Sequence, residues 1–242
     1  TIWSVPGWMK VSASEDYFSA GAPGNWDNTE NKVDTLFYDE YAEYASTLVK
    51  IFKEKTGIDI YALSLQNEPA FCEPYPSAIL PPALYVKLIN IVGKRFNDEG
   101  INCKLFMAEQ VLKQPVYDWI EYLNKMKSDP TAWQYSDIQA VHGYEGNGIT
   151  NYTADSAAWV YNRKVVQDVP HPFDFWMTET ETPSLTWANA LSNASAMSTA
   201  FVHGDISWWT QWDYVEHYTV LGKSNQMAYA QAQFAKFVKP GA

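Results

Sequence analysis

The chain alternates short apolar runs with longer segments whose apolar residues recur at helical spacing. Most of the short runs are apolar on both faces, as the strands of a covered parallel sheet are. They occupy residues 1–5, 60–66, 104–109, 138–144, 173–179 and 205–212. Helices are predicted near residues 34–55, 82–99, 115–127, 153–167, 184–201 and 224–238. The pattern predicts six β-then-α units in series, with no linker that divides the chain.

Alternating strands and helices predict a parallel sheet, either open and doubly wound or closed into a barrel. No Gly-rich phosphate loop follows a predicted strand, so nothing supports the open sheet. Polar residues instead stand at the C-terminal ends of the strands, where a barrel places its active site. These residues are Asn67, Glu68, Glu109, His142, Tyr144, Glu179, Gln211 and Trp212. We therefore predict an α/β fold of the (β/α)8 TIM-barrel type, with residues 1–242 as a single catalytic domain.

Two of these strand-end residues form a pair with a recognisable chemistry. Glu68 is the next-to-last residue of the run SLQNEP, and Pro69 prevents the strand from continuing. Asn-Glu-Pro alone is more often a surface turn, but a second acid follows in DFWMTETE, where Phe175, Met177 and Glu179 share one face of a strand. Two carboxylates on different strands of one cleft are what glycoside hydrolysis requires.

Composition narrows the choice of ligand. The 11 Trp, 16 Tyr and 11 Phe residues exceed the needs of a core of this size, and aromatic faces suit stacking on sugars. A formal charge of −11 argues against a nucleic-acid partner.

No apolar window is long enough to predict a membrane span. Cys72 and Cys103 lie at opposite ends of predicted strands, so we expect two free thiols.

Six motifs, in order, carry a resemblance to a known family. WSVPGWMK, SLQNEP, HGY, WMTE, WW and QFAKFVKPG resemble glycoside hydrolase family 30, a family of retaining β-glycosidases in a clan of (β/α)8 enzymes with acids on strands four and seven. The resemblance covers essentially the whole chain. It implies that Glu68 is the acid/base on strand four and Glu179 the nucleophile on strand seven.

The resemblance also implies roles in binding. Asn67 would bond to the sugar 2-hydroxyl, and Tyr144 would hold the nucleophile. Trp209 would form the floor of the −1 subsite, while Trp3 and Trp8 would line the cleft.

Three of the four remaining candidate residues have alternative interpretations. Glu109 is expected in the cleft or in a core salt bridge, and His142 is either a substrate contact or a buried core histidine. Trp212 is expected to contact substrate. Glu181 shares a strand face with Glu179 and is the alternative nucleophile, although the WMTE motif favours Glu179.

This chain departs from the family in two respects. Family members begin with two more β/α units and carry a β-sandwich beside the barrel, so we expect strands three to eight here and an incomplete N-terminus. The glucuronoxylanase branch places an arginine after the strand-eight tryptophans, whereas no arginine follows Arg163. Recognition of glucuronate by that route is not expected.

The sequence thus predicts a retaining β-glycoside hydrolase acting on a β-linked polysaccharide, such as xylan or a β-1,6-glycan. No cofactor or metal is expected, and no nucleic-acid or membrane partner. A secreted or periplasmic location is expected, with any export sequence outside this chain. The alternative is an inactive carbohydrate-binding relative, which would use the same tryptophans without needing paired acids.

Overall fold

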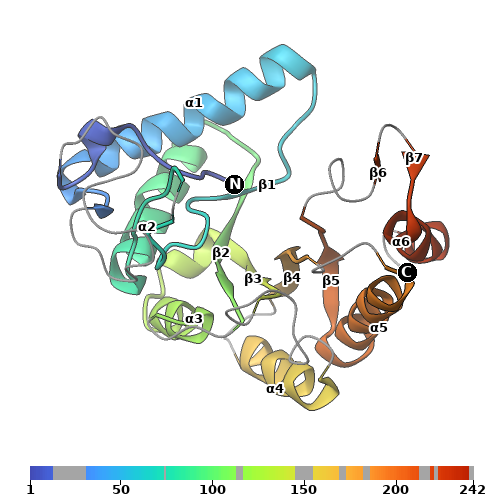
Figure 1. Ribbon diagram of the computed structural model, residues 1–242. Helices are drawn as coiled ribbons and strands as arrows, with labels where there is room; N and C mark the ends of the chain where they lie inside the picture. Colours follow the sequence, from blue (N-terminus) through green and yellow to red (C-terminus); the bar gives the residue numbers. More distant parts are fainter. Residues whose placement is uncertain are drawn as a thin grey trace. The chain divides into compact units, whose positions relative to one another are not determined.

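The computed structural model describes residues 1–12, 31–73, 75–112, 117–144, 155–168, 173–181, 186–212, 219–220 and 223–239. The chain divides into two compact units. Unit 1 comprises Thr1–Ala140 and Val169–Phe173, and unit 2 comprises Val141–Asp168 and Asp174–Ala242. Parallel strands alternate with helices along both units, which confirms the α/β class of fold (Figure 1).

The described residues of unit 1 form two strands and most of a third. β1 (Ala62–Ser64) pairs in parallel with β2 (Lys104–Val111), with Ala62 opposite Lys104 and Ser64 opposite Phe106. β3 (Ser136–His142) is the next strand, and its last two residues belong to unit 2. The helices of unit 1 are α1 (Tyr38–Thr56), α2 (Pro82–Asp98) and α3 (Trp119–Lys127), with short 3-10 turns η1 (Gly7–Met9), η3 (Thr35–Phe37) and η4 (Ala132–Gln134).

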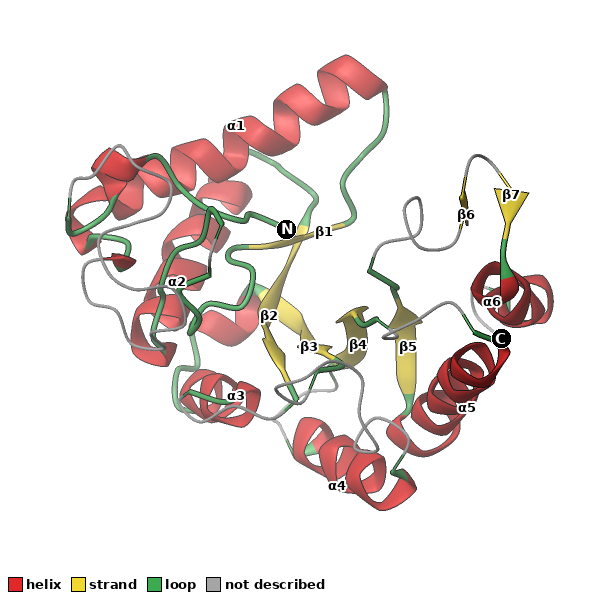
Figure 2. Ribbon diagram, viewed as in Figure 1, coloured by secondary structure: helices red, strands yellow, loops and turns green. Residues whose placement is uncertain are grey.

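Unit 2 is built around a parallel pair of strands. β4 (Asp174–Glu179) pairs with β5 (Ile206–Trp209), with an irregularity between Phe175 and Trp176. Its helices are α4 (Ser156–Gln167), α5 (Trp187–Gly204) and α6 (Gln226–Phe237), and β6 (Thr219–Val220) pairs antiparallel with β7 (Lys223–Ser224). Figure 2 shows the alternation of strand and helix by colour.

All six predicted helices are present, because their end signals are local. The Asp118 side chain accepts bonds from Ile120 N and Glu121 N, and Glu121 bonds back to Asp118 N, a complete capping box at the start of α3. Gly57 ends α1 with φ 73°, a conformation that glycine adopts without strain. The predicted first residues at 115, 153 and 184 lie outside the described residues, and α5 runs three residues beyond its predicted end at 201.

The prediction of a strand at residues 1–5 was wrong. Ile2 N–H donates to Ser64 O at 3.1 Å and Ile2 O accepts from Asn67 N at 2.9 Å. A regular parallel strand bonds to partners two residues apart, whereas these partners are three apart, so an extra residue interrupts the ladder. Pro6 has no N–H with which to resume it.

The main described core lies in unit 1, where α1 and α2 pack against β1 and β2. Tyr41 and Tyr85 are fully buried there, and both donate their hydroxyls to backbone carbonyls, Leu65 O and Phe106 O. Around them lie Val49, Leu63, Leu88, Ile89, Val92, Phe96, Leu105 and Met107. Unit 2 packs Trp159 of α4 over Gly204, where an added Cβ would lie 2.7 Å from the indole ring. These layers hold the strand ends in fixed positions.

Two smaller predictions were tested as well. Cys72 and Cys103 are both free thiols, as expected. Among the described helices, none has the length and apolar character to cross a membrane. The prediction of one domain stays a prediction.

Lys10 provides a test of the packing in unit 1. Its side chain is 1% exposed, and its ammonium donates to Ser77 O at 2.7 Å. Burial lowers the pKa of Lys10 from 10.5 to about 8, partly offset by the nearby Cys72. As the pH falls below 10.5, Lys10 of the unfolded chain binds a proton, whereas Lys10 of the folded chain binds it only near pH 8. The free energy of unfolding therefore decreases as the pH falls from 10.5 to about 8.

We expect Lys10→Met to remove this dependence. Between pH 8 and 9.5 the wild-type free energy of unfolding should rise relative to the variant, by at most about 1.4 kcal/mol per pH unit. Urea unfolding followed by circular dichroism at three pH values measures the difference. If the difference in the free energy of unfolding between the wild type and Lys10→Met stayed constant with pH, the lowered pKa of buried Lys10 would be contradicted.

Candidate active site

Glu179 is held in unit 2 by a tyrosine from the neighbouring strand end. β4 ends at Glu179, and Tyr144 follows β3 by two residues. The Tyr144 hydroxyl donates to Glu179 Oε1 at 3.1 Å. This places Tyr144 where the family resemblance predicts, and the bond fixes the rotation of the carboxylate.

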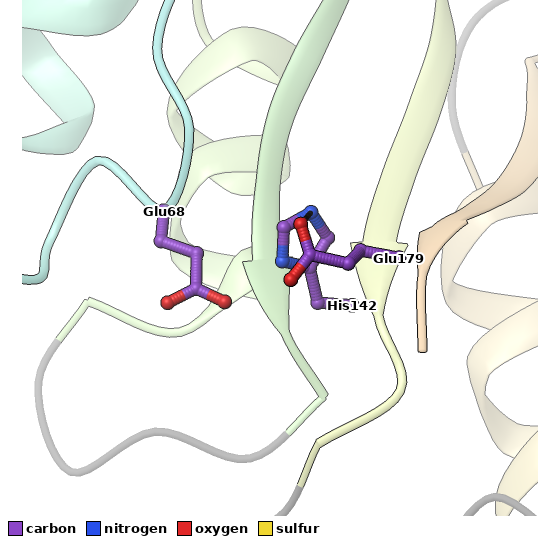
Figure 3. Close-up of side chains that lie close together, drawn as sticks. All are labelled: Glu68, His142 and Glu179. Carbon is purple, nitrogen blue, oxygen red and sulfur yellow. Dashed lines mark ion pairs between the residues drawn. The ribbon is translucent and has the colours of Figure 1, made fainter. Parts of the chain in front are cut away.

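His142 lies near the other oxygen of the same carboxylate. Its Nε2 is 3.9 Å from Glu179 Oε2, and Figure 3 shows its ring beside the Glu179 side chain. The ring is 0% exposed and meets Tyr144 edge to face at 6.1 Å. His142 is therefore fully buried beside the candidate nucleophile, and its contact with substrate stays a prediction.

Gly143 allows this arrangement because it has no side chain. Its N–H donates to Glu179 O at 2.7 Å, which joins the ends of β3 and β4. A Cβ at position 143 would lie 2.4 Å from Thr180 Oγ1 and 2.8 Å from Thr180 Cβ. The HGY motif in the sequence indicates no role for Gly143, because the close approach comes from a distant segment.

The residues after β5 lie beside those after β4. Thr210 N–H donates to Met177 O at 2.9 Å, and Trp212 N–H donates to Thr180 O at 2.8 Å. Gln211 is 6% exposed and donates to Asn193 Oδ1. Trp209 is half-buried and Trp212 is 41% exposed, so Trp212 is the more accessible ring. Glu181 follows β4 and is half-buried.

In unit 1, Glu68 occupies a strained backbone position. Its φ is 36°, a left-handed value that non-glycine residues rarely adopt, and the following Pro69 restricts it further. The residue is 8% exposed, and its carbonyl accepts from Phe71 N at 2.8 Å in a tight turn after β1. Figure 3 labels Glu68 on this turn. Such strain costs of order 1–3 kcal/mol and clusters at functional sites.

Asn67 is tied to an acid that the sequence analysis did not single out. Its Nδ2 donates to Glu73 Oε1 at 3.0 Å, and both residues are 2% exposed. Glu73 N–H in turn donates to Ser77 Oγ. Glu73 lies in an irregular loop with no periodic pattern around it, so no sequence signal marked it as a partner of Asn67.

The other predicted residues of unit 1 differ in their surroundings. Glu109 is buried on β2 and forms an isolated parallel bridge with Asn67, so the structure brings these two together. Trp3 is half-buried with its ring 5.6 Å from that of Tyr75. Trp8 is 46% exposed on η1, where it meets the Phe37 ring at 5.3 Å. Glu68 belongs to unit 1 and Glu179 to unit 2.

Comparison with known proteins shows which family has this arrangement of elements. No protein-family model matches the chain. Glucuronoxylanase XynC of Bacillus subtilis (strain 168) is 26% identical over 88% of this chain, and the endo-1,6-beta-D-glucanase neg1 of Aspergillus fumigatus is 25% identical over 99%. The crystal structure of Xyn30A, a glycoside hydrolase family 30 subfamily 8 xylanase from Clostridium acetobutylicum, superposes on 99% of this chain with a TM-score of 0.73 and 22% identity.

The resemblance to glycoside hydrolase family 30 is confirmed. The chain shares the fold of the family 30 xylanase throughout the superposed part, which accounts for 55% of that structure. It spans about half the length of the curated relatives it matches, 48% of the glucuronoxylanase and 50% of the glucanase.

The close approach at Gly143 leads to a stability prediction. Gly143→Ala should lower the free energy of unfolding by about 1–3 kcal/mol, because the new methyl group overlaps Thr180. Adding Thr180→Ala should recover part of this loss, since it removes the nearer of the two contacting atoms. Chemical unfolding of the single and double variants measures both effects. Full stability in Gly143→Ala would contradict the packing described for the ends of β3 and β4.

Proposed function

We propose that this chain supplies the catalytic residues of a retaining β-glycoside hydrolase that cleaves a β-linked polysaccharide. The observation that carries the proposal is the bond from the Tyr144 hydroxyl to Glu179, at the C-terminal end of a strand in a fold shared with a family 30 xylanase. Barrel enzymes place their reacting groups at this end of the strands. Both relatives described above are named as enzymes that act on polysaccharides.

Glu179 serves as the nucleophile. Tyr144 holds Oε1, so the carboxylate presents a fixed orientation to the sugar. Glu181 is the competing acid, but β4 ends at Glu179 and the WMTE motif favours Glu179.

Glu68 serves as the acid/base. Glu68 lies in a strained turn that the Phe71 N–H and Pro69 hold in place. The turn fixes the backbone from which its side chain extends. In the first step Glu179 attacks the anomeric carbon while Glu68 protonates the departing oxygen. In the second step Glu68 takes a proton from water, which displaces Glu179 from the sugar. Two displacements give net retention.

The remaining predicted residues bind the sugar. Asn67 bonds to the 2-hydroxyl, and Trp209 forms the floor of the −1 subsite. Further contacts come from Trp3, Trp8, Glu109, His142 and Trp212. These steps use no metal or cofactor.

The substrate is xylan or a β-1,6-glycan, in line with the names of the relatives. A polymer without glucuronate side groups is favoured, because the sequence has no arginine after Arg163 that could bind glucuronate on the route used by glucuronoxylanases. A protein that acts on such polymers works outside the cytoplasm, and we assign it to a secreted or periplasmic location.

The role of Glu179 can be tested by a matched pair of amide substitutions. Glu179→Gln should lower kcat on xylan or β-1,6-glucan by about 1,000-fold or more, because the bond to the sugar no longer forms. Glu181→Gln, two residues away with the same change of charge, should retain kcat within about threefold. Reducing-sugar release measures both.

Three other outcomes would contradict the assignment. Loss of activity in Glu181→Gln with activity kept in Glu179→Gln would make Glu181 the nucleophile. Polysaccharide binding that persists without both acids, with no sugar released by the unaltered protein, would establish an inactive carbohydrate-binding relative. Release of sugar that neither substitution affects would place the chemistry elsewhere.

Stereochemistry tests the two-step mechanism and the role of Glu68. The first product seen by proton NMR, before mutarotation, should be the β anomer. Glu68→Ala supplied with azide should form a β-glycosyl azide, because azide enters from the face that water normally uses. Glu179→Ala should give the α-azide, because azide then replaces the nucleophile itself.

An α anomer as the first product would mean inversion and would overturn the assigned roles. A crystal structure offers an independent check, since retention requires about 5–5.5 Å between the two carboxyl groups and inversion about 6.5–9.5 Å.

A further inference from the structure

Three acids are buried among the residues that the structure describes, and each of them adjoins Asn67. Glu68 follows Asn67 in the chain, and Glu109 pairs with it in an isolated parallel bridge. The third acid is Glu73, whose Oε1 accepts from Asn67 Nδ2 at 3.0 Å. Glu68 and Glu109 have proposed roles in the active site, so Glu73 is the buried acid whose role is still to be explained.

Packing alone is a poor explanation for this buried acid. A carboxyl group that leaves water loses free energy, and its hydrogen bonds return only part of it. Where two hydrogen-bonded partners serve only to fill space, apolar groups of the same shape can replace both with little loss of stability. The pairing of Glu73 with Asn67 is better explained by a need to hold a polar side chain in one place.

The loop that carries Glu73 is anchored by Ser77, which is 1% exposed. Ser77 Oγ accepts from Glu73 N and from Asn31 Nδ2, both at 3.1 Å. Ser77 O accepts from Lys10 Nζ at 2.7 Å and from Ser4 Oγ at 3.0 Å. Three of these donors come from earlier segments of the chain, so the backbone of Glu73 is fixed by contacts outside its own loop.

The backbone of Asn67 is fixed independently of Glu73. Its N–H donates to Ile2 O at 2.9 Å, and its carbonyl accepts from Gln66 Nε2 at 3.0 Å. The freedom that remains is rotation about the side-chain bonds of Asn67. The bond to Glu73 restrains this rotation.

We propose that Glu73 is a positioning residue, which holds the Asn67 side chain in place for the 2-hydroxyl of the sugar at the reacting centre. The inference rests on the proposed function, in which Asn67 bonds to that hydroxyl. Glu73 itself does not touch the substrate. Hydrogen bonds to the 2-hydroxyl strengthen in the transition state of glycoside hydrolysis, so Glu73 acts on kcat more than on KM.

The test compares substrates that differ by one hydroxyl. Para-nitrophenyl β-xylobioside and para-nitrophenyl β-gentiobioside represent the two classes of polysaccharide. Each is paired with an analogue in which the sugar next to the nitrophenyl group lacks its 2-hydroxyl. Release of nitrophenol gives kcat and KM for both members of a pair.

Glu73→Met removes the acceptor and keeps a side chain of similar length. It should lower kcat on the parent glycoside by about 10- to 100-fold, with KM changed less than about threefold. On the 2-deoxy analogue kcat should change less than about threefold, because there is no hydroxyl for Asn67 to bond. Turnover of the analogue also shows that the variant is folded.

Two further variants separate positioning from folding. Glu73→Gln keeps an acceptor oxygen and should recover most of the kcat that Glu73→Met loses. Ser77→Ala keeps the acid but removes the acceptor for its N–H. It should lower kcat by about 3- to 10-fold on the parent glycoside alone, and it provides a second test if Glu73→Met does not fold.

Glu99→Met is the matched control. This acid bonds to Lys50 and Arg95 at the C-terminal end of α2, so the same substitution removes two ion pairs away from Asn67. It should leave kcat on both members of a pair within about threefold of the unaltered protein.

Three results would overturn the inference while leaving the proposed function standing. These are full kcat in Glu73→Met, a loss of equal size on the parent glycoside and on its 2-deoxy analogue, and a change confined to KM. Absence of nitrophenol release from both parent glycosides by the unaltered protein would contradict the proposed function, and this inference with it.

Discussion

One backbone hydrogen bond, from Gly143 N–H to Glu179 O, determines the geometry of the candidate site in unit 2. It brings the end of β3 against the end of β4 so closely that position 143 has no room for a side chain. The residues on either side, His142 and Tyr144, then face the Glu179 carboxylate from two directions. The orientation of the proposed nucleophile is therefore a consequence of strand spacing, and the side-chain contacts follow from it.

In unit 1 a strained turn, rather than strand spacing, sets the backbone at the candidate site. There a strained residue, Glu68, turns the chain sharply after β1, and the next residue, Pro69, cannot extend a ladder. The turn is stable because its carbonyls are occupied, Glu68 O by Phe71 N and Pro69 O by Leu80 N. The buried α1 and α2 layers beneath β1 provide the free energy that offsets the strain. The packing of α1 and α2 thus stabilises the strained backbone conformation of Glu68.

The sequence predicted those parts of the molecule whose causes are local. Helix ends were found because a cap such as Asp118 and the residues it bonds are adjacent in the chain. The alternation around Met177 predicted that Glu179 ends its strand, and the family resemblance placed Tyr144 beside it. Features that depend on a distant partner were missed.

Two such features show the limit. The irregular ladder at Ile2 depends on the path of residues 64–67, and the bond from Asn67 to Glu73 depends on how a loop folds back. Neither of these leaves a periodicity or a spacing in the sequence, so only coordinates reveal them.

The bond between Asn67 and Glu73 has a consequence for recognition. Glu73 Oε1 accepts, so Asn67 must turn its NH2 group toward the acid, and its carbonyl oxygen consequently points the opposite way. Reversing the amide would set two oxygens against each other. A buried acid six residues along the chain therefore gives the asparagine a fixed polarity. Replacement of Glu73 alone would release this constraint and let the amide of Asn67 turn either way, without any change to Asn67 itself.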